Sequence, residues 1–367
     1  MVGGALDRVL AQRLATQRLT GPASPDPVGV VRELLCVQAQ DAPLARWSIG
    51  QRSTASEAEV RAAIDDGRIL RTHVLRPTWH YLAAEDLRWL LRLTSPKVLT
   101  GLAGRHRQLG IEPPALREAR RVLVEELSGR RPLTRRALAQ ALIARGLVRE
   151  GDPLTGQQVG HLLLVAELEG LICSGPMQGW EHSYLLVDEV VPPTRPLDRP
   201  AAVRTLVRRF FAGHGPVAVR DLTRWTRLTM TEIAAAVAEL GDDLQTDVVA
   251  GTELWHAPAA VQQTTRRHDT LLVSTFDEIV LTYRFAGFPR ADGHPAGEDV
   301  YRFAETGGGI VLDRLRDAGS WRRTAKGTRW LIDVRLADAA GHRWPAIAEA
   351  AESMAGWFGA TAVLNRR

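Results

Sequence analysis

Two glutamines near the N-terminus have the type and spacing to act together on one ligand. Gln38 and Gln40 directly follow the apolar run LLCV at 34–37. An amide oxygen can orient a water molecule and can face developing positive charge, although it is a weak base. The alternative interpretation is that both amides satisfy unpaired carbonyl groups at the end of a helix.

The two interpretations make different demands on the backbone. Side chains two residues apart point about 200° from each other on an α-helix, whereas they share a face on an extended segment. Pro43 disfavours helical structure at the residue before it, so a helix should end nearby. Gln38 and Gln40 can therefore converge only if the helix breaks after Val37. Asp41 is the nearest carboxylate in the sequence that would add base strength, and its alternative role is a helix cap.

Length and composition restrict the class of protein. A chain of 367 residues predicts two to four domains. Hydrophobic residues make up 45% and charged residues 24%, as in an ordinary soluble globular protein. No apolar run approaches the roughly 18 residues of a membrane span, and the N-terminal residues lack the apolar region of a signal peptide. Cys36 and Cys173 do not suggest a disulfide framework. We therefore expect a cytoplasmic protein with no membrane partner.

Several kinds of chemistry find no support in the sequence. The only lysines, Lys97 and Lys326, lie outside any G-x-x-x-x-G-K-[ST] pattern. C-x-x-C, H-E-x-x-H and G-x-S-x-G patterns are also lacking, and GGGIVL at 307–312 does not precede a helix. The sequence thus predicts no metal site and no cofactor, nucleotide cofactors included.

Arginine supplies nearly all of the positive charge. Only two of the 47 basic residues are lysines. Residues 101–150 hold eleven arginines against five acidic residues, and residues 201–230 hold six against one. Biased codon use accounts for the missing lysines but not for this clustering. Because arginine makes bidentate phosphate contacts, the clusters predict a phosphate-facing surface and a nucleic-acid partner.

The chain repeats one order of predicted elements three times, namely helices followed by a β-hairpin. This is the winged-helix order, in which the third helix usually enters a DNA groove. No residue-level repeat accompanies it. The predicted fold class is α+β, with three tandem winged-helix units and a C-terminal α+β domain that contains a β-hairpin. The expected boundaries are 1–100, 101–195 and 196–270 for the three units and 271–367 for the C-terminal domain.

Local signals predict where individual elements begin and end. Asp26 followed by proline is a predicted N-cap, Ser56 with Glu59 a capping box, and Thr134 a further N-cap. Residues 190–200, VVPPTRPLDRP, contain four prolines and predict a linker.

Further signals concern turns, strands and the C-terminus. Residues 175–180 predict a turn before a strand, and residues 270–284 and 307–323 alternate as strands do. DAG at 317–319 predicts a hairpin tip, and residues 345–367 an Ala-rich helix.

Four motifs in order resemble one known family. They are VQAQDAP at 37–43, VLRPTWHYLAAEDLRWL at 74–90, LLVSTFDEIVLTYR at 271–284 and IVLDRLRDAGSWRR at 310–323. Together they resemble the AlkZ/YcaQ-type winged-helix DNA glycosylases, which carry a Gln-hydrophobic-Gln or Gln-hydrophobic-Asp motif. The resemblance covers nearly the whole chain. Pro77 departs from the glycine that we expect in much of the family.

The resemblance implies hydrolysis of the N-glycosidic bond of alkylated purines, typically N7 adducts, and for some members the unhooking of interstrand crosslinks. Gln38 and Gln40 would then position water and stabilise an oxocarbenium-like sugar. A bifunctional glycosylase needs an amine for a Schiff base, and neither lysine lies in a motif of the site. We therefore expect a monofunctional enzyme. A bulky adduct would favour approach from the groove over flipping into a snug pocket.

The expected partner is double-stranded DNA containing alkylated purines, bound by a monomer. Asp41 and Asp277 are candidates for support of the site, the second because a carboxylate beside an apolar phenylalanine usually has a defined partner. The alternatives are a non-catalytic winged-helix transcription regulator and a nucleic-acid-binding protein of toxin or partner-interaction type. The candidate DNA contacts are Arg71, Arg76, Arg135, Arg136, Arg220, Arg224, Arg227, Arg314 and Arg316, of which Arg314 and Arg316 would belong to a groove-probing hairpin.

Overall fold

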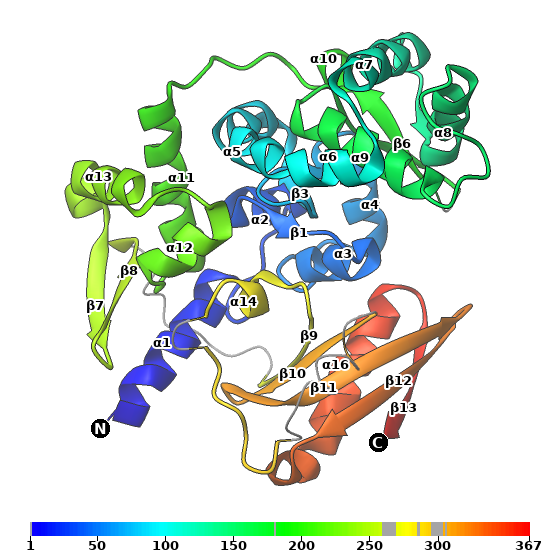
Figure 1. Cartoon of the computed structure of the whole chain (residues 1–367). Helices are drawn as coiled ribbons and strands as arrows, with labels where there is room; N and C mark the ends of the chain where they lie inside the picture. Colours follow the sequence, from blue (N-terminus) through cyan, green and yellow to red (C-terminus); the bar gives the residue numbers. More distant parts are fainter. Residues whose placement is uncertain (1, 180, 259–268, 285–286, 295–303, 305–306) are drawn as a thin grey trace.

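Figure 1 shows the chain as a computed structural model, which describes all residues except 1, 180, 259–268, 285–286, 295–303 and 305–306. The N-terminal helix α1 (Val2–Thr16) precedes three segments with similar element order and a C-terminal sheet. The structure is mixed α and β. Within the described part of the chain, no helix has both the length and the apolar character that crossing a membrane requires.

The first segment forms a small sheet against three helices. Its strands lie in the order β1-β3-β2, and both pairings are antiparallel. Its elements are α2 (Pro27–Leu34), β1 (Val37–Gln38), α3 (Ala42–Gly50), α4 (Glu57–Asp65), β2 (Ile69–His73) and β3 (Trp79–Ala83).

Side-chain caps fix the starts of these helices. The Asp26 carboxylate accepts hydrogen bonds from the backbone N–H groups of Val28 and Gly29, and proline occupies the first turn of α2. Ser56 and Glu59 form a complete capping box at α4. Both predicted starts are confirmed.

The second and third segments repeat this order. The second has a sheet in the order β4-β6-β5, and in the third the bridge Val217–Trp255 replaces the first strand. Connecting them to the first segment are η1 (Ala84–Asp86), α5 (Leu87–Gly101) and α6 (Ala103–Leu109). The second segment contains α7 (Pro113–Leu127), β4 (Leu133–Thr134), α8 (Arg135–Ala144), α9 (Thr155–Leu168), β5 (Ile172–Gln178), β6 (Glu181–Leu186) and α10 (Val187–Val190). The third contains α11 (Arg199–His214), α12 (Val219–Thr226), α13 (Met230–Leu240), η2 (Gly241–Asp243), β7 (Gln245–Val249) and β8 (Thr252–His256).

The proline-rich linker and one cap agree with the sequence, whereas one turn does not. Residues 191–198 have no regular structure and run as an extended connection from α10 to α11 (Figure 1). Thr134 caps α8 by accepting from the Ala137 N–H at 3.3 Å. The turn predicted at 175–180 is wrong for most of its length, because β5 continues to Gln178 with an irregular register against β6.

A five-stranded sheet with the order β13-β12-β11-β10-β9 forms the C-terminal part. Only the β12–β13 pairing is parallel. Its elements are β9 (Thr270–Ser274), α14 (Glu278–Leu281), β10 (Gly308–Asp313), β11 (Arg316–Lys326), β12 (Arg329–Leu336), η4 (Asp338–Arg343), α16 (Trp344–Trp357) and β13 (Thr361–Arg366).

Three sequence predictions in this part are wrong, namely one strand, the terminal helix and one hairpin tip. The strand expected over 270–284 ends at Ser274, because Asp277 caps α14 by accepting from the Ile279 N–H. The terminal helix ends at Trp357, since Gly359 takes a φ of 70° and the chain returns as β13.

The DAG sequence is not a hairpin tip. It lies inside β11, and the turn uses Arg314 and Leu315, both with positive φ. Gly319 is required for a different reason, because a Cβ atom there would lie 2.0 Å from the Arg335 carbonyl oxygen on β12. The close approach of two strands, rather than a turn, selects this glycine.

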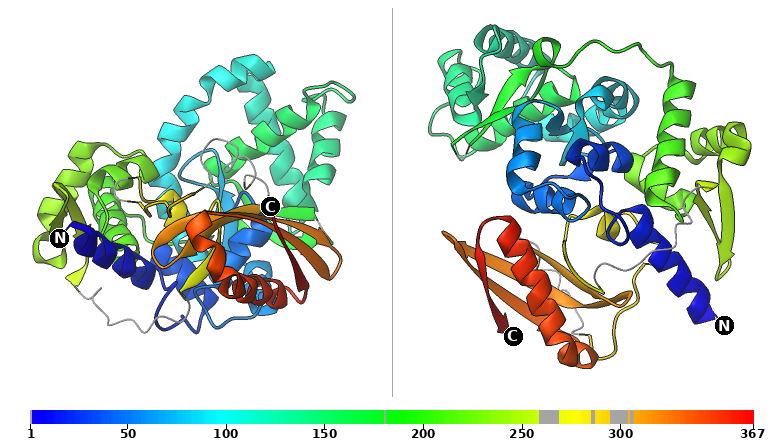
Figure 2. Two further views of the ribbon diagram at one scale, coloured as in Figure 1. Left: turned by 90° about the horizontal axis from the view of Figure 1, so that it is seen from below. Right: turned by 180° about the vertical axis from the view of Figure 1, so that it is seen from behind.

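The C-terminal sheet and α16 lie beside the first segment, as Figure 2 shows from two further sides. Trp47 on α3 packs edge-on against Trp357 on α16, with 5.6 Å between ring centroids. The Trp47 indole N–H also donates to the Leu272 carbonyl on β9 at 3.2 Å. These contacts fix α3, which begins two residues after Gln40.

Candidate active site

The Gln-x-Gln stretch lies outside any helix, as the two side chains require. Helix α2 has ended at Leu34, and β1 pairs Gln38 with His80 on β3. The Ala39 N–H continues this pairing by donating to the Trp79 carbonyl at 2.7 Å. Strand β1 ends at Gln38 and Gln40 lies in the bend that follows, so neither glutamine is helical, and each side chain is placed by its own hydrogen bonds. The backbone demand made by the sequence is therefore met.

Gln38 is 7% exposed and is held at both its backbone and its side chain. Its amide oxygen Oε1 accepts from Nη2 of Arg76 at 2.8 Å. Its backbone N–H donates to Oε1 of Glu278 at 3.1 Å. Arg76 in turn donates from Nη1 to the Trp225 carbonyl at 3.2 Å and lies 3.3 Å from Nε2 of His80.

Gln40 is exposed and is oriented by the neighbouring strand. Its Oε1 accepts from the backbone N–H of Trp79 at 2.9 Å. Arg71 donates from both Nε and Nη2 to the carbonyl of Ala39, each at 3.1 Å, and its guanidinium lies 4.3 Å from the centre of the Trp79 ring. Arg71 is 8% exposed. Arg71, which the sequence predicts as a DNA contact, holds the residue between the two glutamines and also lines a second cavity.

The two carboxylates named from the sequence have structural partners. Asp277 is fully buried, and its oxygens accept from Arg52 at 2.6 and 2.9 Å. Asp41 caps α3 by accepting from the Leu44 N–H at 3.0 Å. Neither carboxylate has a recorded contact with Gln38 or Gln40 among the described residues.

Glu278, one residue after Asp277, is the carboxylate that does contact Gln38. It is 1% exposed, and its Oε2 accepts from the Trp225 indole N–H at 2.9 Å and from Thr282 Oγ1 at 3.3 Å. Burial raises the pKa of Glu278, and the nearby charge of Arg76 partly opposes this. Sequence reasoning missed it. The signal in the sequence was that Glu278 follows Asp277 directly within the apolar stretch FDEIVL. Two consecutive side chains point in different directions, so a second buried acid needs a partner of its own.

Four predicted residues meet at one cavity of about 420 Å³, lined by Gln38, Arg76, Arg224, Arg227 and Leu281. Arg224 is anchored through Nη2 to the carbonyls of Leu281 and Thr282. Three guanidinium groups therefore surround the only uncharged polar side chain in this lining. Such a cavity favours an anionic ligand next to the Gln38 amide.

A second cavity, of about 580 Å³, adjoins Gln40 through Trp79. Arg135 donates to the Gly156 carbonyl at 2.6 Å, and the Arg136 side chain is 77% exposed, 3.8 Å from Glu181. The cavity is lined by residues of the first and second segments, namely Arg71, Trp79, Arg135, Arg136, Ala139, Thr155, Gly156, Val159, Glu181, His182 and Tyr184.

The remaining predicted arginines line neither cavity. Arg220 is exposed on α12, and Arg314 is exposed at the β10–β11 turn. Arg316 donates to Asp7 on α1 at 2.9 Å, so the turn predicted to probe a groove is tied to the N-terminal helix. The turn between β11 and β12, residues 327–328, is exposed along with the flanking strand ends.

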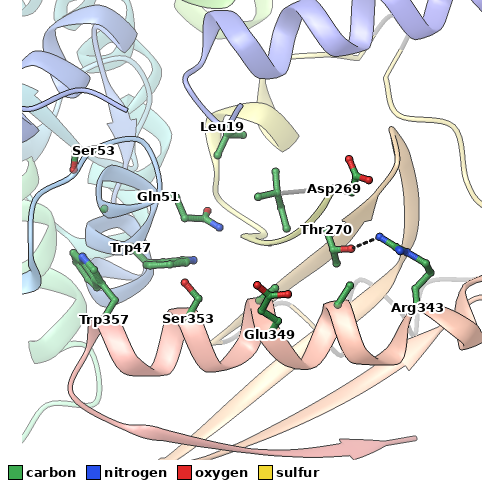
Figure 3. Close-up of a pocket in the computed structure, with 14 residues that line it drawn as sticks. Leu19, Trp47, Gln51, Ser53, Asp269, Thr270, Arg343, Glu349, Ser353 and Trp357 are labelled. Atoms are coloured by element: carbon green, nitrogen blue, oxygen red, sulfur yellow. Dashed lines mark hydrogen bonds between the residues drawn. The ribbon is translucent and has the colours of Figure 1, made fainter. Parts of the chain in front are cut away.

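A larger cavity, of about 860 Å³, lies between α3, β9 and α16 (Figure 3). Figure 3 shows Gln51 and Trp47 facing Ser353 and Glu349 across it, with Arg343 bonded to Thr270. Its lining contains neither Gln38 nor Gln40 and none of the predicted arginines. The candidate active site is therefore the one near the start of α3, and not this larger cavity.

His80 is close enough to the site to be considered as an acid. It is fully buried, its Nδ1 faces the Thr78 carbonyl at 2.9 Å, and burial together with Arg76 lowers its pKa well below the usual value. A neutral imidazole is therefore expected near neutral pH, which excludes His80 as a proton donor there. Among the described residues, no three His, Cys, Asp or Glu side chains gather as metal ligands would.

Three histidines with lowered pKa values predict a loss of stability in acid. Burial lowers the pKa of His161 and His182 to about 4 and that of His214 to about 3. Since these pKa values lie below the unfolded value of about 6.5, the stabilisation is present above pH 6.5 and is lost as the pH falls. Urea unfolding at pH 7.5, 6.5 and 5.5 should show falling midpoints. For His214 alone the slope approaches about 1.4 kcal/mol per pH unit below its unfolded pKa.

The His214→Gln variant provides the control for this prediction. Its unfolding free energy should depend less steeply on pH than that of the wild type, by about one proton. Equal slopes for the two proteins would contradict the assignment of a neutral His214.

A model of the family described as DNA glycosylase AlkZ-like matches residues 31–357. The structure is similar to that of Streptomyces sahachiroi DNA glycosylase AlkZ, with a TM-score of 0.74, 19% sequence identity, and coverage of 98% of this chain and 99% of that one. A search of curated protein sequences gave no match. The family match spans Gln38, Arg76 and Glu278.

Proposed function

Because this chain belongs to the AlkZ-like DNA glycosylase family, we propose that it hydrolyses the N-glycosidic bond of N7-alkylated purines, with Gln38 and Gln40 as the catalytic pair. Family membership makes the chain a DNA-repair glycosylase with DNA as its partner. The lesion and the roles of the two glutamines are the proposed part. Bulky and crosslinked N7 adducts belong to the same proposed class.

The chemistry of the lesion suits a site built on amides. Alkylation at N7 places positive charge on the base, which then leaves as a neutral species and needs little acid catalysis. What remains is an oxocarbenium-like sugar and a water molecule to capture it. An amide oxygen can orient that water and face the developing charge, provided the amide is held in place before the reaction. Such a site should act on labile cationic bases and fail on stable neutral ones.

The observation that carries the proposal is the position of Gln38 in the cavity with Arg76, Arg224 and Arg227. The arginines supply charge that would hold the DNA backbone, while the Gln38 amide lies among them. Arg76 occupies one acceptor direction of Oε1, and a carbonyl oxygen has a second lone pair for water. The same arrangement without chemistry would serve a regulator, so base release is the decisive measurement.

The test is release of free base from duplex DNA that carries N7-methylguanine, followed by chromatography of the products. We expect free base and an abasic strand, with no strand cleavage and no adduct trapped by borohydride. Lys97 makes the trapping control necessary, since its Nζ donates to the Arg227 carbonyl at 2.6 Å, beside the cavity. Release from no N7 adduct would favour the non-catalytic regulator instead. A trapped adduct that disappears in Lys97→Arg would contradict the monofunctional assignment.

We also propose that the three segments with repeated element order are winged-helix units within 1–100, 101–195 and 196–270, followed by a C-terminal α+β domain at 271–367. Their shared strand order and their connected helices support this division. Three units in one chain would let a monomer bind one duplex. Winged-helix regulators, by contrast, commonly bind palindromic sites as symmetric dimers.

Removing one cavity arginine should weaken DNA binding uniformly across sequences. Arg227→Ala is expected to lower affinity and to reduce the slope of log K against log salt by about one, because one phosphate contact and its counterion are lost. Fluorescence anisotropy on one duplex at several salt concentrations measures this slope. Arg68→Ala, at an exposed residue outside the predicted DNA contacts, serves as the comparison and should leave the slope unchanged. An unchanged slope for Arg227→Ala would contradict its assignment as a phosphate contact.

A further inference from the structure

A closed ring of hydrogen bonds ties the Gln38 amide to two other parts of the chain. The Gln38 N–H donates to Glu278 on α14, which accepts from the indole of Trp225 on α12. The Trp225 carbonyl accepts from Arg76, and Arg76 donates to the Gln38 side-chain oxygen. The ring therefore joins the first segment, the third segment and the C-terminal part. A change at any member should move the Gln38 amide.

Glu278 is the charged member that closes this ring, and its charge is not directly neutralised. The carboxylate accepts three hydrogen bonds, from Gln38, Trp225 and Thr282. Within the described residues, the Nε2 atom of His214 lies 3.9 Å from the carboxylate, and burial keeps that imidazole neutral by lowering its pKa to about 3. The adjacent Asp277 differs, since it forms a bidentate pair with Arg52.

A buried carboxylate is expensive to maintain unless the site needs both of its oxygens or its charge. A glutamine could accept from Trp225 and Thr282 with its single oxygen, but it would then turn its NH2 group toward the Gln38 N–H. The charge is retained directly behind Gln38, and Glu278 itself does not line the cavity. In a low-dielectric site, this negative charge favours positive charge that develops on the cavity side of Gln38.

We propose that Glu278 is a positioning residue of the glycosylase site, which orients the Gln38 amide and, through Trp225, the Arg76 guanidinium, and whose charge favours the oxocarbenium-like state of the sugar. This inference rests on the proposed function of Gln38. Neutral amides stabilise a developing positive charge only weakly. The Glu278 carboxylate, which lies outside the Gln-x-Gln motif, would supply the missing negative charge. Glu278 does not touch the substrate and exchanges no proton with it.

The protonation of Glu278 should be visible in the pH dependence of the single-turnover rate. Burial raises its pKa, so proton uptake should occur above the usual range of a glutamate. The charged and titratable groups around it are Arg76, His214, Cys36 and Asp277. The single-turnover rate should fall in acid, where the carboxyl group becomes neutral and one oxygen no longer accepts. The Glu278→Gln variant should lack this acid limb.

The experiment compares Glu278→Gln with a matched control, Asp86→Asn, in the full chain. Asp86 is also a buried carboxylate bonded to an indole N–H, that of Trp89, and it pairs with Arg209 away from the cavity. Single-turnover release of N7-methylguanine and binding to DNA with an abasic-site analogue are measured for both. We expect Glu278→Gln to slow release about 10- to 100-fold with its Kd nearly unchanged. Asp86→Asn should lower the melting temperature and keep the rate of the folded protein.

The outcomes separate the inference from the proposed function. A wild-type protein that releases no base would overturn the function and the inference together. An active wild type with an equally active Glu278→Gln, or one whose loss of rate matches its loss of binding, would overturn the inference alone. If Glu278→Gln fails to fold, Trp225→Phe and Thr282→Val each remove one donor to the carboxylate. A slower rate with an altered acid limb in either variant supports the proposal, and wild-type rate and pH profile in both overturn it.

Discussion

Replacing Gln38 and Gln40 together by alanine is expected to slow base release by a factor of about 100 or more, while the affinity for DNA with an abasic-site analogue stays nearly unchanged. The reason is that the two amides supply orientation and charge stabilisation, and the arginines supply binding. A loss of rate without a loss of affinity indicates interactions made mainly in the transition state. Single-turnover kinetics with enzyme in excess over N7-methylguanine duplex measures the chemical step.

The two single variants should differ in how much they slow base release. Gln38→Ala removes the buried amide that lines the cavity and also frees Nη2 of Arg76, so it should cost more than Gln40→Ala. Gln51→Ala is the matched control, because Gln51 donates its amide to the Leu272 carbonyl at 3.1 Å in the cavity of Figure 3, away from the site. Folded Gln51→Ala should keep the wild-type rate. A Gln38→Ala/Gln40→Ala double variant that releases base at the wild-type rate would rule out the catalytic pair.

Replacing Arg52 by alanine should be the most destabilising of the substitutions considered. Arg52 is 1% exposed and donates to both oxygens of Asp277, to the Gln17 side chain at 3.0 Å and to the Ser48 carbonyl at 2.8 Å. Its loss leaves the Asp277 carboxylate buried without a counter-charge. We expect the free energy of unfolding to fall by about 3–5 kcal/mol, measured by urea denaturation at pH 7.5.

Two further variants show whether the buried charge is the cause. Arg52→Met combined with Asp277→Leu removes both charges at similar volume and should be less destabilising than Arg52→Ala. Arg68→Ala breaks an exposed pair with Asp66, at 3.6 Å, and should leave the midpoint within experimental error. A wild-type midpoint for Arg52→Ala would show that the pair contributes nothing to stability.

Local chemistry explains why much of the fold was predictable. The caps at Asp26, Ser56 and Thr134 act within three residues of themselves, so the sequence around each contains the whole interaction. The linker follows from its prolines for the same reason. The repeated order of helices and hairpins was also visible, whereas the identity of the three units as winged-helix domains remains a proposal.

In the candidate site, too, local features could be predicted from the sequence and long-range contacts could not. The sequence by itself placed Gln38 and Gln40 in a stretch where the helix had to end, because Pro43 and the spacing of the two amides are local facts. It also placed Arg76, Arg224 and Arg227 among the candidates for phosphate contact. That these three arginines surround Gln38 depends on the packing of the first segment against the third, across nearly 150 residues of chain for the Arg76–Trp225 contact.

The tertiary structure alone decided which carboxylate faces the site. Asp277 and Glu278 are adjacent and both buried, yet Asp277 points to Arg52 and Glu278 to Gln38, each across more than 220 residues. It also placed Arg71, a predicted DNA contact, within hydrogen-bond distance of the Ala39 carbonyl. The physical reason is that a buried charge must find a partner, and the sequence specifies that need but not the partner, which depends on long-range packing.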